Sequence, residues 1–232
     1  MGELLKVDKV IKSYGKKEVL KQISFEVGTG KIVGLLGPNG SGKSTTIKLI
    51  NGLIKQDSGT ITVKGNTPGV ETKKVVSYLP ERTYLNNWMV VKDIVDFFQD
   101  FYADFDRARA EEMFEKLDIE LDVPLKTMSK GTKEKVQLIL VMSRRAELYI
   151  LDEPIGGVDP AARDYILKTI IQNYSETSSI IIATHLIQEI ESICDEVIFI
   201  KKGEVLLQGN TDDIREEKGK SIDELFREVF AC

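Results

Sequence analysis

The sequence predicts an α/β fold with a mainly parallel β-sheet, helices on both of its faces, an antiparallel β edge region and an inserted all-helical lobe. Three observations carry this prediction. Short apolar segments alternate with segments of helical spacing through much of the chain. Alternating segments near the N-terminus and a hairpin pattern near the C-terminus predict the antiparallel strands. Between them, residues 91–145 have helical character, which predicts the lobe.

The composition is that of a folded protein, and it argues against a nucleic-acid-binding protein, a membrane-spanning protein and a disulfide-rich protein. Of the 232 residues, 30% are charged and 42% hydrophobic, and the net charge of −5 gives no basic field for nucleic acid. No apolar run approaches the ~20 residues of a membrane span, and the N-terminus shows no signal pattern. Because only Cys194 and Cys232 are cysteines, no disulfide framework is expected, and a reducing cytoplasm is the simplest setting.

The N-terminal elements surround one glycine-rich loop. Apolar–polar alternation or short apolar runs predict strands there, and a run of helical spacing predicts one helix that ends at Gly52. We expect strands at residues 4–10, 19–27, 31–37, 58–65 and 73–79, and a helix at residues 43–51. The last of these strands leads into Pro80 and Glu81.

The central and C-terminal elements follow from the same patterns. In the lobe, apolar residues recur at three- and four-residue spacing, so Phe97, Phe98, Phe101 and Phe105 are expected in its core. The other expected elements are a helix at 108–117, strands at 147–152 and 178–184, a helix at 161–173, a hairpin at 196–201 and 204–209, and a last helix that begins with the capping box Ser221–Glu224. We expect a single domain over 1–232, with its core at 1–81 and 146–232 and the lobe at 82–145.

The glycine-rich loop reads Gly-Pro-Asn-Gly-Ser-Gly-Lys-Ser-Thr and fits the phosphate-loop pattern in its required context of strand, loop and helix. Glycines let the backbone point several N–H groups at one anion, and the following helix adds its positive end. Lys43 would reach the β- and γ-phosphates, and Ser44 would hold Mg²⁺. The alternative, a glycine turn that binds nothing, does not account for that context. The expected nucleotide contacts are Gly37, Asn39, Gly40, Ser41, Gly42, Lys43, Ser44 and Thr45.

Two apolar strands end in residues that suit phosphate chemistry. Asp152 ends one of them, where a carboxylate is costly unless it is paired or binds a metal, and Glu153 beside it could polarise an attacking water. His185, the only histidine, ends the other and could contact the γ-phosphate. The alternatives are a pair of solvated acids and a structural or solvent-facing histidine. Tyr14 could stack on adenine, although a tyrosine at such a position is more often a surface or core aromatic when considered alone.

Taken in order, these residues resemble the nucleotide-binding subunits of ABC transporters along nearly the whole chain. Seven segments carry the resemblance, including a signature that is usually Leu-Ser-Gly-Gly-Gln and a loop that normally ends in glutamine. The segments are the adenine-stacking Tyr14, the phosphate loop Gly37–Thr45, the coupling loop Tyr78–Glu81, the signature Met128–Thr132, the magnesium strand Leu148–Glu153 with its catalytic glutamate, the dimer-interface loop Gly157–Asp159 and the switch His185.

Two of these segments depart from the family pattern. Glu81 replaces the glutamine, which places a third carboxylate near the expected metal. In the signature, Ser129 and Gly131 remain, whereas Lys130 replaces a glycine and Thr132 replaces the glutamine. These departures are similar to those of the exporter-type branch. They bear on catalytic efficiency more than on the fold.

The resemblance implies a P-loop NTPase core that binds ATP and Mg²⁺, with Ser44, Asp152 and Glu81 as metal ligands and Glu153 and His185 as catalytic residues. It implies a head-to-tail dimer with a second copy or a homologous ATPase subunit, in which Ser129, Gly131 and Asp159 complete the partner's nucleotide site. ATP hydrolysis would then drive separate transmembrane permease subunits from the inner face of the cell membrane.

Two alternatives to a transport motor are considered. One is a soluble ABC-type ATPase that acts as an ATP-gated assembly or regulatory module. The other, a DNA-repair head domain, lacks the long heptad insertion that it would need. For a membrane partner, Tyr84 and Trp88 are the expected anchors, because they precede the lobe's first helix in a polar loop and should be partly exposed.

Overall fold

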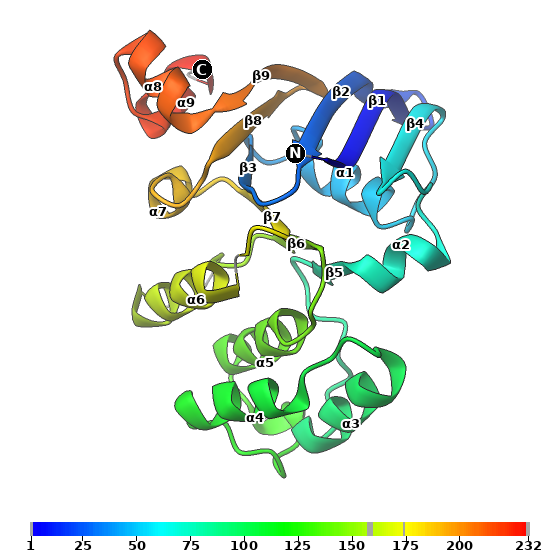
Figure 1. Ribbon diagram of the computed structural model, residues 1–232, viewed down its shortest axis with the longest axis vertical. Coiled ribbons are helices and arrows are strands. Elements are labelled where there is room, and N and C mark those ends of the chain that lie inside the picture. The colour runs from blue at the N-terminus through cyan, green and yellow to red at the C-terminus, as the bar shows by residue number, and fades with distance from the viewer. Residues whose placement is uncertain (1, 157–159, 174, 231–232) are drawn as a thin grey trace.

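The computed structural model of the chain describes residues 2–156, 160–173 and 175–230, and it has the predicted α/β fold with antiparallel edges and a helical lobe (Figure 1). A six-stranded sheet has the order β5-β6-β7-β3-β8-β9, and a three-stranded sheet has the order β2-β1-β4. Helices α3, α4 and α5 gather below the sheets in Figure 1, whereas α8 and α9 lie beside β9 at the top. In this described part, no helix is both long and apolar enough to span a membrane.

The six-stranded sheet is parallel in its centre and antiparallel at one edge. Its strands are β5 (Val76–Leu79), β6 (Leu148–Asp152), β7 (Ser179–Thr184), β3 (Ile32–Leu36), β8 (Glu196–Lys201) and β9 (Glu204–Asn210). All residues of β3, β6 and β7 are buried, as expected for parallel strands covered on both faces. Leu36 pairs with Thr184, and Asp152 pairs with Ala183, so these three strands end at one edge of the sheet.

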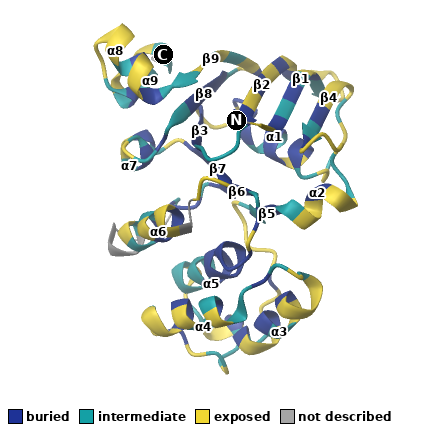
Figure 2. Cartoon of the chain, in the orientation of Figure 1, coloured by how far each residue is buried: buried dark blue, intermediate teal, exposed yellow. Residues whose placement is uncertain are grey.

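The three-stranded sheet is antiparallel and covers one face of the larger sheet. It consists of β1 (Glu3–Tyr14), β2 (Lys17–Gly28) and β4 (Ser58–Val63). Its inner residues, such as Leu5, Leu20 and Ile61, share a core with Leu35 of β3 and with helix α1 (Lys43–Ile50). In Figure 2, buried residues alternate with intermediate or exposed ones along the strands of this sheet.

The helical lobe and the C-terminal helices share a second core with the other face of the large sheet. The lobe contains α3 (Val91–Phe101), α4 (Arg107–Lys116), a 3₁₀ turn at Leu125–Thr127 and α5 (Lys130–Met142). The remaining helices are α6 (Pro160–Asn173), α7 (Ile187–Ile190), α8 (Thr211–Lys218) and α9 (Ile222–Phe230). Residues 136–142 of α5 are all buried, so this helix forms the centre of the second core.

One buried arginine joins the lobe to the sheet. Arg144, which is 4% exposed, follows α5 and pairs with the Asp104 carboxylate at 3.0 Å. Its guanidinium also donates to the carbonyl oxygens of Val76 and Lys74 at 2.7 and 3.0 Å, and it lies 4.0 Å from the ring centroid of Tyr102. A charge at this depth is tolerated because several acceptors surround it.

Several expected elements are confirmed, and one expected strand is partly wrong. The capping box forms, because the Glu224 N–H donates to Ser221 Oγ at 3.1 Å and the Ser221 N–H donates to the Glu224 carboxylate at 2.9 Å. The strand expected at 73–79 is wrong in its first half, which forms helix α2 (Val70–Val75). Thr72 Oγ1 accepts from the Gly69 N–H at 2.9 Å and so caps that helix. The short helices α7 and α8 were not anticipated.

Of the four phenylalanines expected in the core of the lobe, two are buried and two are exposed. Phe98 and Phe105 are buried, whereas Phe97 and Phe101 are 53% and 67% exposed. The reason is helical phase, because α3 buries Val91, Ile94, Val95 and Phe98 on one face. Phe97 and Phe101 lie one turn apart on a neighbouring face and stack on each other with ring centroids 5.6 Å apart.

The turn between β8 and β9 yields a stability prediction. Gly203 has φ +81°, and a Cβ there would overlap the Val19 carbonyl oxygen. Gly203→Ala should therefore lower the free energy of unfolding by about 1–3 kcal/mol more than a glycine substitution at similar φ in open space. Gly65, with φ +74° and no atom within 4 Å of its Cβ position, is that control. Urea denaturation of both variants measures the difference, and equal losses would contradict the close packing at Gly203.

Candidate functional site

The glycine-rich loop joins the end of β3 to the start of α1, as the motif requires. Gly40 and Gly42 have φ +79° and +121°, which L side chains rarely adopt. A Cβ on Gly42 would lie 2.6 Å from Leu20 Cδ2, and one on Gly37 would overlap the Ile200 carbonyl oxygen. Glycine is therefore needed for both conformation and space, and the loop can fold tightly around an anion.

Lys43 is the cation of this loop and is 5% exposed. Its ammonium group donates to the Gly37 carbonyl oxygen at 2.6 Å and to the Pro38 carbonyl oxygen at 3.4 Å. Burial lowers the pKa of Lys43, while the charges of Glu153, Asp152 and Glu81 act in the opposite direction. Two neutral carbonyl oxygens do not neutralise the charge, so the position suits a bound phosphate.

Asp152 ends β6 and faces the first residues of α1. Burial raises its pKa to about 6, while a hydrogen bond from Ser44 opposes the shift and the charges of Glu153 and Glu81 add to it. Its Oδ1 is buried and has no hydrogen-bond partner among the described residues. An unsatisfied carboxylate oxygen next to a serine hydroxyl fits Mg²⁺, which usually takes one or two protein oxygens and completes its shell with phosphate and water. Asp152 and Ser44 would therefore hold the metal.

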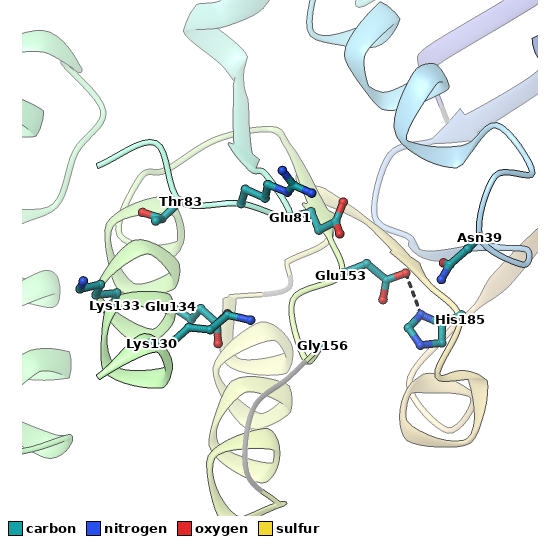
Figure 3. A pocket seen from close by; sticks show the side chains of 10 residues that line it. Asn39, Glu81, Thr83, Lys130, Lys133, Glu134, Glu153, Gly156 and His185 are labelled. Atoms are coloured by element: carbon teal, nitrogen blue, oxygen red, sulfur yellow. Dashed lines mark hydrogen bonds and ion pairs between the residues drawn. The ribbon is translucent and has the colours of Figure 1, made fainter. Parts of the chain in front are cut away.

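Glu153 and His185 form a hydrogen-bonded pair at the same edge. Glu153 has a left-handed φ of +52°, and its N–H donates to the Ala183 carbonyl oxygen at 2.8 Å. Its carboxylate accepts from Thr184 Oγ1 at 2.9 Å and lies 3.0 Å from His185 Nδ1 (Figure 3). The end of β7 thus holds the carboxylate of a residue that follows β6, and the arrangement can orient a water molecule or an attacking hydroxyl.

Two adjoining cavities contain these groups. The smaller, of about 370 Å³, is lined by Lys17, Val19, Asn39, Gly40, Gly42, Lys43, Ser44, Thr45, Glu81 and Glu153. The larger, of about 640 Å³, shares Asn39, Glu81 and Glu153 with it and extends to His185 and to Lys130 of α5. Figure 3 shows Glu81, Glu153 and His185 on one side and Lys130 and Glu134 on the other. Together the two cavities have room for a nucleotide with its phosphates at Lys43.

Tyr14 lines neither cavity itself, but its strand partner Lys17 lines the smaller one. Tyr14 ends β1 and is paired with Lys17 across a two-residue turn, and its side chain is half exposed. Sequence reasoning missed Lys17 and Val19, which line the cavity. The signal that could have found them is this short hairpin, because it places the residues after Tyr14 beside whatever Tyr14 contacts.

The signature residues lie at the start of α5. Ser129 caps that helix, since its Oγ accepts from the Thr132 N–H at 3.1 Å. Ser129 and Gly131 line neither cavity, whereas Lys130 lines the larger one. Asp159, the expected interface residue, lies outside the described residues. Within one chain, Ser129 and Gly131 therefore do not line the cavities that contain the phosphate loop.

An apolar groove of about 870 Å³ separates α3 from the region of α1 and α2. The exposed apolar side chains that line it are Leu53, Val70, Tyr84, Phe97 and Phe101. The expectation that Tyr84 or Trp88 is partly exposed is confirmed, at 52% and 72%. Trp88 does not line the groove, however. Contiguous exposed apolar surface of this kind is typical of a protein interaction site.

Comparison with known proteins gives one consistent family. A family model described as ABC transporter matches residues 20–156. The chain is 34% identical over 219 residues to the linearmycin resistance ATP-binding protein LnrL of Bacillus subtilis (strain 168), and the match covers 91% of the chain and 70% of LnrL. It is 30% identical over 222 residues to the Nod factor export ATP-binding protein I of Sinorhizobium fredii (strain NBRC 101917 / NGR234), with 92% and 65% covered.

The solved structures agree with this result. The structure of an ATP-binding subunit of an ABC transporter superposes with a TM-score of 0.87 at 32% identity, covering 97% of this chain and 99% of that one. The family model spans more than half of the chain, and the relatives align along nearly all of it. The chain therefore belongs to the ABC transporter family, with the nucleotide-binding fold of its ATP-binding subunits.

Proposed function

We propose that the chain is the ATP-hydrolysing motor of an ABC transporter whose membrane-spanning subunits are separate chains. One observation carries the proposal: the phosphate-loop Lys43, the unsatisfied Asp152 carboxylate and the Glu153–His185 pair meet at one edge of the sheet. The names of relatives, one for linearmycin resistance and one for Nod factor export, support an exporter.

Each group at the edge has a step to perform. Lys43 and the loop amides hold the β- and γ-phosphates, and Tyr14 stacks on adenine. Ser44 and Asp152, with Glu81 near them, would hold Mg²⁺, which would supply positive charge beside the phosphate oxygens. Glu153 accepts a hydrogen bond from the attacking water and aligns it with the γ-phosphate. His185 holds the Glu153 carboxylate in that orientation and presents its other ring nitrogen to the γ-phosphate.

The proposal includes a dimer, because within one chain Ser129 and Gly131 do not line the cavities at its own phosphate loop. In a head-to-tail pair with a second copy or a homologous subunit, Ser129, Gly131 and Asp159 would reach the nucleotide of the partner. The amides at the start of α5 then face the γ-phosphate. ATP binding and closure of the dimer become one linked equilibrium.

The apolar groove is the proposed contact with the permease. Its aromatic side chains bury a large area at a low cost in side-chain entropy, as binding anchors do. Phe97 and Phe101 belong to the lobe, and Val70 belongs to α2, so a segment seated in the groove contacts both parts of the chain. The subunit would in this way lie on the cytoplasmic face of the cell membrane without entering it.

A substitution at Glu153 tests the motor and the dimer together. Glu153→Gln keeps the shape of the side chain and removes the base, so ATP turnover should fall about 10²–10⁴-fold. ATP-dependent dimers should persist, because hydrolysis no longer reopens them. Size-exclusion chromatography with ATP and Mg²⁺ measures this, and Lys43→Ala, which should bind nucleotide weakly, is the matched control. A monomeric Glu153→Gln chain at saturating ATP would count against the dimer.

A second substitution tests whether Glu81 contributes to metal binding. Glu81→Gln removes one carboxylate from the metal's surroundings and should raise the Mg²⁺ concentration for half-maximal hydrolysis roughly fivefold, equivalent to ~1 kcal/mol of Coulomb attraction in a solvated site. Nucleotide affinity without metal should stay nearly constant. Glu71→Gln, on α2 and outside both nucleotide cavities, is the control. If hydrolysis by wild type and by Glu81→Gln depends on Mg²⁺ concentration in the same way, Glu81 is not a metal ligand and serves only to couple the core to the helical lobe.

The permease contact is tested by comparing two exposed aromatic residues. Phe101→Ala should reduce the amount of a polytopic membrane protein that a tagged chain recovers from detergent-solubilised membranes, because Phe101 lines the groove. Its melting temperature should stay near that of wild type, since the side chain is 67% exposed. Trp88→Ala, at a side chain that is 72% exposed but outside the groove, should recover the wild-type amount. Equal recovery by both variants would place the contact elsewhere.

A further inference from the structure

The end of β1 that carries Tyr14 is held by a carboxylate from a distant loop. Asp57, between α1 and β4, is 45 residues from Lys12 in the sequence. Its Oδ1 accepts from Lys12 Nζ at 2.9 Å, and its Oδ2 accepts from the Ser13 N–H at 2.6 Å. Its own N–H donates to the Ile11 carbonyl oxygen at 2.9 Å. The three residues before Tyr14 are therefore each hydrogen-bonded to Asp57, two to its carboxylate and one to its N–H.

The hydrogen bonds of Asp57 extend the contact between β1 and the β4 segment beyond the last pair of the two strands. The pairing of β1 with β4 ends at Ile11 and Ser58, where β4 begins. Beyond that point, the Asp57 carboxylate takes the place of a strand partner for the Ser13 N–H. The hydrogen bond from Lys12 and, to a smaller extent, that from the Ser13 N–H lower the pKa of Asp57, so the carboxyl group is ionised at neutral pH. Charge-assisted hydrogen bonds of this kind are stronger than those between neutral groups.

The same carboxylate also acts on the tyrosine ring. Lys12 Nζ, which Asp57 holds, lies 5.7 Å from the centroid of the Tyr14 ring, within the range of a cation–π contact. The Lys12 side chain is only 15% exposed, whereas the Tyr14 ring is half exposed. A half-exposed ring has few packing neighbours to fix its rotamer, so the contact from Lys12 restricts a side chain that would otherwise be free to turn.

We propose that Asp57 is a positioning residue for nucleotide binding, which orders Tyr14 as a stacking surface before the base arrives. The inference rests on the adenine-stacking role of Tyr14 under the proposed function. Ordering a group in advance increases affinity, because less conformational entropy is lost on binding. Asp57 follows α1, and α1 begins at the phosphate loop, so one segment of chain holds both the phosphate end and the base end of the site.

A double-mutant cycle tests this role. Isothermal titration calorimetry with MgADP, which avoids turnover, would be run on wild type, Tyr14→Ala, Asp57→Ala and the double variant. Tyr14→Ala should weaken binding about tenfold. Asp57→Ala should weaken it roughly two- to tenfold, the effect of one unrestrained side chain. The double variant should bind as Tyr14→Ala does, because Asp57 acts only through Tyr14.

The control is a lysine–carboxylate pair of similar length and exposure away from the nucleotide. Glu147 pairs with Lys64 at 2.7 Å, and its side chain is 38% exposed against 43% for Asp57. Glu147→Ala should bind ADP as wild type does. Wild-type affinity in Asp57→Ala, or a double variant weaker than Tyr14→Ala by the full Asp57 factor, would overturn the inference and leave the proposed function standing. Wild-type affinity in Tyr14→Ala would instead overturn the adenine role itself, and this inference with it.

Discussion

The site depends on the parallel register of β6, β7 and β3. Because these strands end together, the phosphate loop after Leu36, the carboxylates at Asp152 and Glu153 and the imidazole of His185 meet without any long connection. A slip of one residue would turn every side chain to the opposite face of the sheet. Burial of all residues in the three strands opposes such a slip, so packing on both faces of the sheet fixes the geometry of the polar edge.

The charges at that edge are arranged for two ligands at once. Burial disfavours the charged form of both Lys43 and Asp152, which lowers the pKa of the first and raises that of the second. A phosphate relieves the first cost and a divalent cation relieves the second. Neither ligand alone satisfies both groups, so a metal–nucleotide complex is the species that the site suits best. Glu153 adds backbone strain, which the hydrogen bonds from Thr184 and the Glu153 N–H offset.

The sequence predicted what depends on local spacing and missed what depends on distant contacts. The strand, loop and helix around Lys43 followed from glycine spacing and an apolar run, and the capping box at Ser221 followed from two residues. The helix Val70–Val75 did not, since its last carbonyl groups are bonded by Arg144, about 70 residues away. The exposure of Phe97 and Phe101 depends on which face of α3 meets the lobe core. The roles of Lys17 and Asp57 needed the hairpin and the β1–β4 register.

The turn at Gly203 has a consequence for the order of events during synthesis. Its N–H donates to the Ser41 carbonyl oxygen and its carbonyl accepts from the Lys21 N–H, so a late segment lies between the phosphate loop and β2. β3 likewise lies between β7 and β8, which leave the ribosome well over a hundred residues later. A nascent chain therefore carries the whole phosphate-loop motif long before that loop has its neighbours. Contacts of such high sequence separation form slowly, and the early strands remain exposed to chaperones or to aggregation until β7 and β8 have been translated.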